Sequence, residues 1–220
     1  MAEIVAVCTV HALLPDRSIG VTAIDKRAAD GPLRVRKLGV HGDLQADRKW
    51  HGGEDQAVYA YAEEDAEWFA RDLVRDVPAG TFGENLRTRG VDVSGAVIGE
   101  RWRIGEKLVL EVTSPRNPCG TFERRMGVKG WVKRFAAYGA PGAYFRVVRA
   151  GDVAAGDTVE VVDRPDHGVT IGGWYTREDP DDAQRLLDAA ATGAVRLQPE
   201  LRTHLDKVLA RARSEAVLQG

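Results

Sequence analysis

Up to residue 162, apolar residues alternate with polar ones in short stretches, a period that is typical of half-buried strands. Glycine-rich turns separate most of these stretches. The pattern predicts strands over residues 3–14, 33–40, 57–61, 98–104, 108–112, 143–149 and 157–162. Because many short, evenly spaced strands with glycine turns are typical of closed barrels, we expect a β-barrel rather than a doubly wound parallel sheet.

Helical spacing of apolar residues occurs in a few other segments. Residues 63–74 form one such segment, and residues 121–137 predict a helix in pieces, broken near Gly127 and Gly130. After residue 164 the pattern predicts two amphipathic helices, 178–191 and 199–213, with a turn or short helix at 169–175. The chain therefore reads as a mainly β domain with helices (α+β) over residues 1–164 and a helical extension over 165–220. A structural role or a homodimer contact is the natural expectation for the extension.

Composition is that of a soluble globular protein, with 220 residues, 44% hydrophobic and 29% charged. No apolar run approaches the roughly 18 residues of a membrane span, and the N-terminus lacks the pattern of a signal peptide. We therefore expect a cytoplasmic protein that does not contact a membrane. The two cysteines, Cys8 and Cys119, are predicted to be thiols rather than a disulfide.

Charge is unevenly distributed although the formal net charge is only −2, a value that argues against nucleic-acid binding. Residues 101–150 contain eleven Lys or Arg and three Asp or Glu, whereas residues 151–192 contain three Arg and ten Asp or Glu. Cys119 lies in the basic half. A positive field around a cysteine suits an anionic small ligand such as a phosphate ester, and a solvated basic face is the alternative.

The most unusual stretch is residues 114–120, Ser-Pro-Arg-Asn-Pro-Cys-Gly. Two prolines restrict the backbone before Cys119, and Gly120 lets a ligand approach the sulfur. Arg116 places a positive charge nearby, which favours the thiolate that binds soft metals and attacks electrophiles. The alternative is a small, packed cysteine at the end of a strand.

A second polar stretch, residues 41–58, has neither helical nor strand periodicity. By residue type, His41, Asp43, Asp47 and His51 could bind a metal, but their spacing matches no known motif. A hydrogen-bonded network that directs Arg48, Lys49 and His51 toward an anion is more plausible, and a turn at Gly52 and Gly53 with solvated charges is the structural alternative. Glu84 and Asn85, in a third glycine-rich segment, are either turn residues or polar groups lining a site.

Three segments together resemble the MOSC family, the domain named after the C-terminal part of molybdenum cofactor sulfurase. They are residues 42–47 with 51–53 and 57–58, residues 82–86 (Phe-Gly-Glu-Asn-Leu), and residues 115–119 (Pro-Arg-Asn-Pro-Cys). Their order and spacing resemble the family over residues 1–162. The likeness is greatest to the bacterial 6-N-hydroxylaminopurine resistance proteins, whose three-helix extension is similar to the helical tail.

This resemblance implies a barrel like the small domain of pyruvate kinase and a molybdopterin-type cofactor whose molybdenum is bound by Cys119, the implied catalytic residue. It also implies a reductase that removes oxygen from N-hydroxylated small molecules. By position, we expect the cofactor to be bound by Arg48, Lys49, His51, Glu84, Asn85, Arg116 and Asn117. Pyridoxal phosphate is associated with the family, but no lysine of this chain lies in a recognisable Schiff-base motif.

The electrons would have to come from a separate flavin or iron–sulfur reductase. No Gly-x-Gly-x-x-Gly follows a strand, and two cysteines cannot build a four-thiolate cluster. Two positions depart from the family pattern: Gln56 and Thr121 stand where lysine is common. Two alternatives remain, a non-catalytic carrier of sulfur or cofactor, and a module that binds a phosphate ligand while Cys119 is merely packed.

Overall fold

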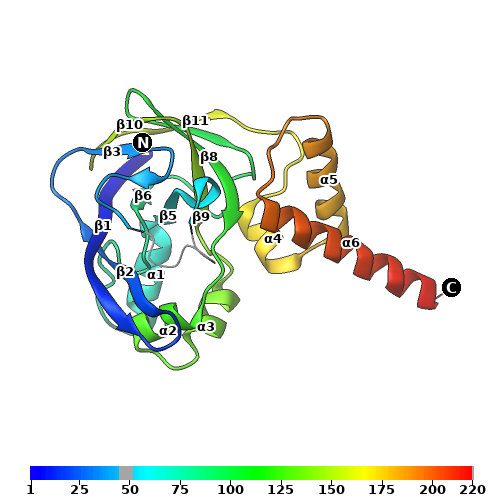
Figure 1. Cartoon of the computed structure of the whole chain (residues 1–220), viewed down its shortest axis with the longest axis horizontal. Coiled ribbons are helices and arrows are strands. Elements are labelled where there is room, and N and C mark those ends of the chain that lie inside the picture. Colours follow the sequence, from blue (N-terminus) through cyan, green and yellow to red (C-terminus); the bar gives the residue numbers. More distant parts are fainter. Residues whose placement is uncertain (45–51, 220) are drawn as a thin grey trace.

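The computed structural model describes residues 1–44 and 52–219, and the strands and helices of this part are shown in Figure 1. The strands are β1 (Glu3–Asp16), β2 (Gly20–Ala28), β3 (Leu33–Arg36), β4 (Gly39–Val40), β5 (Val58–Ala62), β6 (Leu86–Arg89), β7 (Arg101–Ile104), β8 (Leu108–Pro115), β9 (Ala143–Arg149), β10 (Gly151–Val153) and β11 (Val159–Asp163). The helices are the 3-10 turn η1 (Glu54–Gln56) and α1 (Glu63–Leu73), α2 (Gly120–Met126), α3 (Trp131–Tyr138), α4 (Ile171–Arg177), α5 (Pro180–Ala191) and α6 (Pro199–Gln219).

Most strands belong to one eight-stranded sheet with the order β11-β7-β8-β9-β5-β6-β1-β2. Its neighbours are antiparallel except for β5 and β6, which pair in parallel with Ala60 opposite Leu86. A separate three-stranded sheet has the order β10-β3-β4. The α+β class is therefore as predicted, with helices beside a large sheet.

The predicted closed barrel is wrong, because neither sheet closes on itself. The start of β1 and the residues next to β11 are joined by an isolated bridge between Glu3 and Thr158 and by a few flanking backbone hydrogen bonds, without a continuous ladder. Beyond this point β1 pairs with β2 from Cys8 onward, so that β1 turns away from β11. β11 in turn pairs with β7 in antiparallel orientation. A barrel needs a continuous ladder between the edge strands, and one bridge does not supply it.

Several predicted elements are confirmed with shifted ends. The first strand, the helix at 63–74 and the hairpin of β7 and β8 occur as expected, and Gly127 lies between α2 and α3. The predicted strand at 33–40 is instead split into β3 and β4. The strand β10 was missed: its three residues pair with β3, a partner far away in the sequence, and local periodicity carries no signal for such a pairing.

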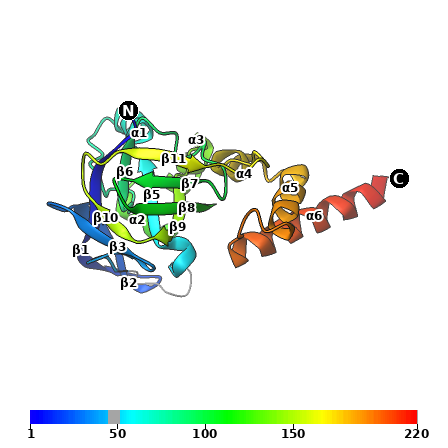
Figure 2. The same ribbon diagram turned by 90° about the horizontal axis from the view of Figure 1, so that it is seen from above.

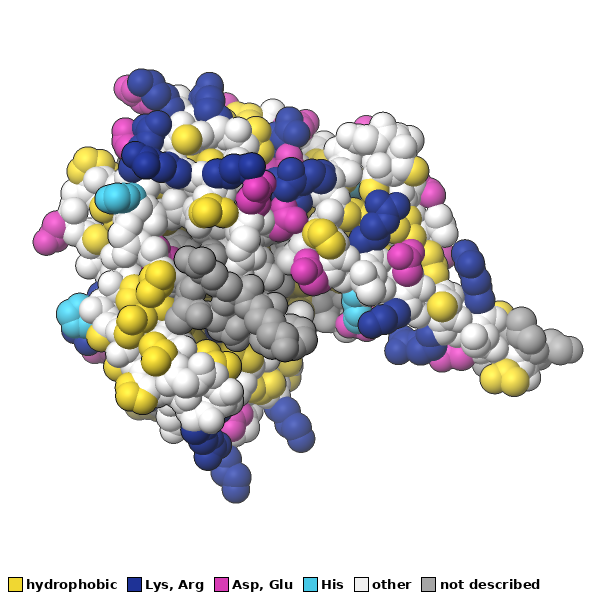
Figure 3. Space-filling model, viewed as in Figure 1, with side chains coloured by type: hydrophobic (Ala, Val, Ile, Leu, Met, Phe, Trp, Pro, Cys, Tyr) yellow, Lys and Arg dark blue, Asp and Glu magenta, His cyan; other side chains and the backbone are white. Residues whose placement is uncertain are grey.

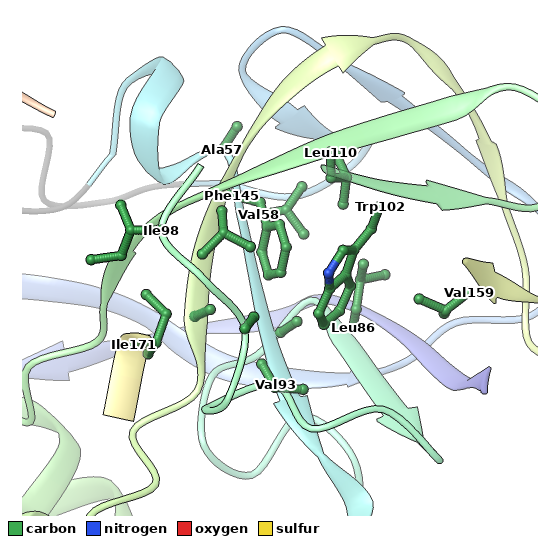
Figure 4. Packing of buried hydrophobic residues seen from close by; sticks show 14 of the residues in the cluster. Ala57, Val58, Leu86, Val93, Ile98, Trp102, Leu110, Phe145, Val159 and Ile171 are labelled. Carbon is green, nitrogen blue, oxygen red and sulfur yellow. The ribbon is translucent and has the colours of Figure 1, made fainter. Parts of the chain in front are cut away.

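A continuous apolar core joins the sheet to the helical extension. Figure 4 shows Trp102, Phe145 and Leu86 packed together, with Ile171 of α4 at the edge of the same cluster. Leu186 of α5 and Leu205 of α6 belong to this cluster as well. The extension is thus packed on the sheet through its first helix, while the far end of α6 projects away from it (Figure 2).

A second, mostly aromatic cluster lies under α1, α2 and α3. Phe82, Phe122 and Phe135 are fully buried in it, with ring centroids 5.1 to 6.0 Å apart. Cys119 packs against this cluster from the segment that joins β8 to α2. The aromatic cluster therefore forms the support on which that segment rests.

None of the helices in the described part of the chain is both long enough and apolar enough to cross a bilayer.

The contact between α1 and α3 predicts a pH-dependent stability. Tyr138 donates a hydrogen bond to Asp65 at 2.8 Å, and burial raises the pKa of Asp65 from 3.8 to about 6. The folded state therefore holds a proton that the unfolded state releases, so the free energy of unfolding should fall as the pH rises from 4 to 6. We expect a loss of about 1–2 kcal/mol, reduced by the partial exposure of the carboxyl group. Urea unfolding of Asp65→Asn should lack this slope, and an equal slope in the variant would contradict the assignment.

Candidate functional site

A cavity of about 400 Å³ lies between the β1–β2 hairpin and the segment that carries Cys119. We call it the thiol cavity. Its wall contains Ser18, Ile19, Thr22, Ala23, Ile24, Lys26, Asp43, Leu44, Gly52, Gln56, Tyr59, Phe82, Gly83, Asn85, Arg116, Cys119, Gly120, Thr121 and Tyr144. The volume is that of a small-molecule or cofactor site.

Cys119 is placed by the end of one element and the start of the next. β8 ends at Pro115, α2 begins at Gly120, and Cys119 lies between them in an extended conformation (φ −129°, ψ 171°). The side chain is partly exposed and lines the cavity, whereas Cys8 is completely buried. The sulfur is therefore accessible from the cavity rather than sealed in the core.

Arg116 brings a buried positive charge to the same wall. Its guanidinium carbon lies 3.6 Å from the centroid of the Phe122 ring, and the residue is only 6% exposed. It forms no ion pair with the described carboxylates, and its Nη1 atom is buried without a hydrogen-bond partner among the described residues. A buried charge without a counter-ion is costly, so this arrangement favours an anionic ligand.

The positive field expected from the sequence is mostly neutralised elsewhere. In Figure 3, Lys and Arg side chains gather along the top of the molecule, where Figure 1 places β3, β10 and β11. Arg124 and Arg125 of α2 pair with Asp16 and Asp25 of the hairpin, each at 2.6 Å. These two pairs hold the hairpin against α2 and thereby fix one wall of the cavity. Of the basic half of the sequence, Arg116 is the cation that lines the cavity.

Two tyrosines complete the wall beside Arg116. Tyr59 donates a hydrogen bond to the carbonyl of Pro141 at 2.8 Å, and its ring lies 5.2 Å from that of Tyr144. Removal from water raises the pKa of Tyr144, although the charge of Arg116 opposes this shift. The phenol of Tyr144 is therefore neutral at physiological pH and can act as a hydrogen-bond donor.

A polar network forms another part of the wall. Asp43 accepts hydrogen bonds from Lys26 at 2.7 Å, Asn85 at 2.8 Å and the amide of Val10 at 3.1 Å. The amide side chain of Asn85 also bonds the backbone of Tyr59 and Cys8. Asp43 and Asn85 thus join β1, β2 and β5, and most of their hydrogen-bonding capacity is used within the protein.

Glu84 is directed away from the cavity. It is fully buried, accepts hydrogen bonds from the amides of Gly80 and Phe82, and pairs with the guanidinium of Arg87. Arg87 also pairs with Glu63 at 2.8 Å. Glu84 therefore fixes the glycine-rich segment from inside, and it does not line the cavity.

The structure brings some of the predicted site residues together and separates others. Asn85, Arg116 and Cys119 line the thiol cavity. Asn117, which lies between Arg116 and Cys119 in the sequence, instead lines a neighbouring cavity. The predictions for Arg48, Lys49 and His51 lie outside the described residues, as does that for Asp47.

Sequence reasoning missed Lys26, Tyr59 and Tyr144 as parts of the wall. The two tyrosines lie in strands whose alternation reads as ordinary core, and β2, which carries Lys26, was not recognised as a strand. The two tyrosines lie close together because β5 pairs with β9, with Tyr59 opposite Tyr144. Within the described ranges, no group of three or more His, Cys, Asp or Glu is arranged to hold a metal ion.

The buried pair of Glu84 and Arg87 predicts a large stability effect. Glu84→Gln should lower the free energy of unfolding by about 3 kcal/mol, because it leaves a buried guanidinium with less compensation. The matched control is Glu160→Gln, which removes the exposed partner of Arg103 and should cost less than about 1 kcal/mol. Urea titrations measure both values, and equal small losses would refute the structural role of Glu84.

The two cysteines should differ sharply in reactivity. Burial, together with the Glu84 carboxylate, raises the pKa of the Cys8 thiol to about 12, whereas Cys119 is reachable from the cavity. An aromatic disulfide reagent should therefore titrate one thiol rapidly in the native protein and two in denaturant. Cys119→Ser should remove the rapid phase. A rapid phase that persists in this variant would show that the accessible thiol has been misassigned.

Comparisons with known proteins agree with this geometry. The MOSC domain family model matches residues 47–160, which is more than half of the chain. Protein YiiM of Escherichia coli (strain K12) is 34% identical over 177 residues, covering 77% of this chain and 78% of that protein. The crystal structure of YiiM from Geobacillus stearothermophilus superposes with a TM-score of 0.75 at 25% identity, over 95% of this chain and all of that one.

A longer fungal relative carries a functional name. A protein named Reductase from Gibberella moniliformis (strain M3125 / FGSC 7600) is 33% identical over 147 residues, which are 66% of this chain but only 26% of that protein. The family predicted from the three segments is confirmed by the family match. This chain belongs to the MOSC domain family.

Proposed function

We propose that the protein binds a molybdenum cofactor in the thiol cavity and reduces N-hydroxylated small molecules with electrons from a separate reductase. The single observation that carries the proposal is the juxtaposition of an accessible thiol, Cys119, with the buried charge of Arg116, which pairs with no carboxylate of the described residues, on one cavity wall. Family membership and the relative named Reductase support the same direction.

The donor set of the cavity fits such a cofactor. A thiolate is a suitable soft ligand for molybdenum, and a buried guanidinium is a suitable partner for a phosphate group. The described residues offer no cluster of three metal-binding side chains. A metal held by Cys119 would therefore take its remaining ligands from the organic part of a cofactor or from the small molecule that reacts.

The side chains of this chain have distinct proposed roles. Cys119 would anchor the metal, Arg116 would neutralise the cofactor phosphate, and Tyr144 would donate a hydrogen bond within the cavity. The Lys26–Asp43–Asn85 network would keep the wall rigid, since its members already bind one another. When bound, the cofactor supplies the two-electron chemistry that removes oxygen from nitrogen.

The proposed electron donor is a second protein, a flavin or iron–sulfur reductase. The fungal Reductase is, as a whole, nearly four times as long as its matching segment. Whether this electron donor is a separate protein or a fused domain, it must approach the thiol cavity. The exposed apolar residues Ile19 and Leu44 line this cavity.

The proposal is tested by cofactor analysis of protein produced in a host that makes the molybdenum cofactor. We expect molybdenum and pterin near one equivalent per chain in wild type, less than a tenth of that in Cys119→Ala, and a loss of roughly tenfold or more in Arg116→Met. Cys8→Ala is the matched control and should load like wild type.

Activity is measured with a viologen as artificial donor and an amidoxime as substrate. Loaded wild type should turn over, and Cys119→Ala should not. Loading without turnover would favour the non-catalytic carrier instead. Failure of the wild type to load under conditions that load a known molybdoenzyme would contradict the proposal and favour a module that binds only a phosphate ligand.

A further inference from the structure

A second cavity of about 400 Å³ lies where the helical extension meets the end of β8. We call it the extension cavity. Its walls come from Ser114, Pro115 and Asn117 on one side, and from α4 and the start of α6 on the other. The extension was expected to have only a structural or dimer-contact role, and here it supplies more than half of a cavity wall.

The two cavities share a partition. Residues 115–119 run between them: Arg116 and Cys119 line the thiol cavity, and Pro115 and Asn117 line the extension cavity. Gln56 and Tyr144 line both. A small molecule in the extension cavity therefore lies on the other side of the segment that carries the reactive thiol, with two shared residues at the boundary.

The extension cavity is lined by negatively charged side chains, whereas the thiol cavity contains the positive charge of Arg116. Its described lining contains two carboxylates, Glu178 and Glu200, and neither lysine nor arginine. Glu178 contacts Nε2 of His204 at 2.9 Å, and no ion pair of Glu200 with the described residues is recorded. Acidic side chains of the extension, Glu178 at the end of α4 and Glu200 of α6, thus lie next to the basic segment that carries Arg116.

Aromatic and amide groups add a preference for flat ligands that donate hydrogen bonds. Trp174 and Tyr175 of α4 line the cavity, and the Trp174 ring meets the His204 ring edge to face at 5.8 Å. Gln198 is 95% buried and lines the cavity, and its side-chain amide makes no hydrogen bond within the described part of the chain. The side-chain amide of Gln198 can therefore bind a polar ligand in the cavity.

The cavity is held in shape by ion pairs outside its wall. Asp55 of η1 pairs with Arg146 of β9 at 2.9 Å and with Arg196, two residues before Gln198, at 2.7 Å. Thr113 of β8 donates a hydrogen bond to the backbone carbonyl of Asp55 at 2.6 Å. Because the carboxylate of Asp55 joins the extension to β9 and its backbone carbonyl binds β8, the walls of the cavity are preorganised.

We propose that the extension cavity binds the planar, cationic nitrogen head of a small molecule, such as an amidinium, a guanidinium or a protonated aminoheterocycle. Glu178 and Glu200 compensate its charge, Gln198 accepts a hydrogen bond from its N–H groups, and the aromatic residues of α4 pack on its flat face. If this head is the non-reacting part of the substrate, a role that rests on the proposed function, its other end reaches toward Cys119 past Gln56 and Tyr144.

Calorimetry with benzamidine tests this site on protein prepared without cofactor, so that failure of the cofactor proposal does not affect the result. Benzamidine should bind at least tenfold more tightly than neutral benzamide, and benzoate should bind more weakly still. The double variant Glu178→Gln, Glu200→Gln should weaken benzamidine binding about tenfold or more. Glu160→Gln, which neutralises an exposed carboxylate of β11, is the matched control and should bind like wild type.

Two further variants keep the test decisive. Glu178→Lys with Glu200→Lys should reverse the preference toward benzoate, and Cys119→Ala should leave benzamidine binding unchanged because the thiol lies in the other cavity. Circular dichroism verifies that each variant is folded. Unchanged affinity in the double Gln variant, loss of affinity in Cys119→Ala, or no difference between benzamidine and benzamide would each overturn the proposal.

Discussion

The site depends on a positive charge, that of Arg116, which forms no ion pair with the carboxylates of residues 1–44 and 52–219. Arg116 is stacked 3.6 Å above the Phe122 ring and nearly excluded from water. The aromatic face compensates part of the charge, by about 1–2 kcal/mol, but it cannot replace a carboxylate. The aromatic cluster is therefore more than a core: it holds a guanidinium in place beside a thiol, so that an anion entering the cavity completes the charge balance.

The surrounding structure uses other ion pairs to keep that arrangement fixed. Arg124 and Arg125 bind buried carboxylates of the β1–β2 hairpin, and Glu84 is occupied by Arg87. Arg124 and Arg125 are thereby drawn to the hairpin, and of the described cations that line the cavity Lys26 is paired with Asp43 whereas Arg116 is not paired with a described carboxylate. On the opposite side of the partition, the helical extension contributes carboxylates, so one extended segment separates two cavities of opposite character.

Local patterns predicted most strands and helices, because periodicity and glycine breaks act over a few residues. Proline-restricted and glycine-rich segments, which are visible in the chain itself, contain Cys119, Arg116 and Asn85, and these three residues line the thiol cavity. The closed barrel was wrong because closure depends on pairing between β1 and β11, which no local signal encodes. For the same reason Tyr144 and Lys26 were missed, and Glu84 could not be recognised as the partner of Arg87 from its neighbours in the sequence.

The central claim is that Arg116 binds an anion directly beside the Cys119 sulfur, and alkylation kinetics in the presence of inorganic pyrophosphate test it most directly. The account predicts that millimolar pyrophosphate slows alkylation of Cys119 by iodoacetamide several-fold in wild type and has no effect in Arg116→Met. Equal rates with and without pyrophosphate in wild type, or equal protection in the variant, would contradict it.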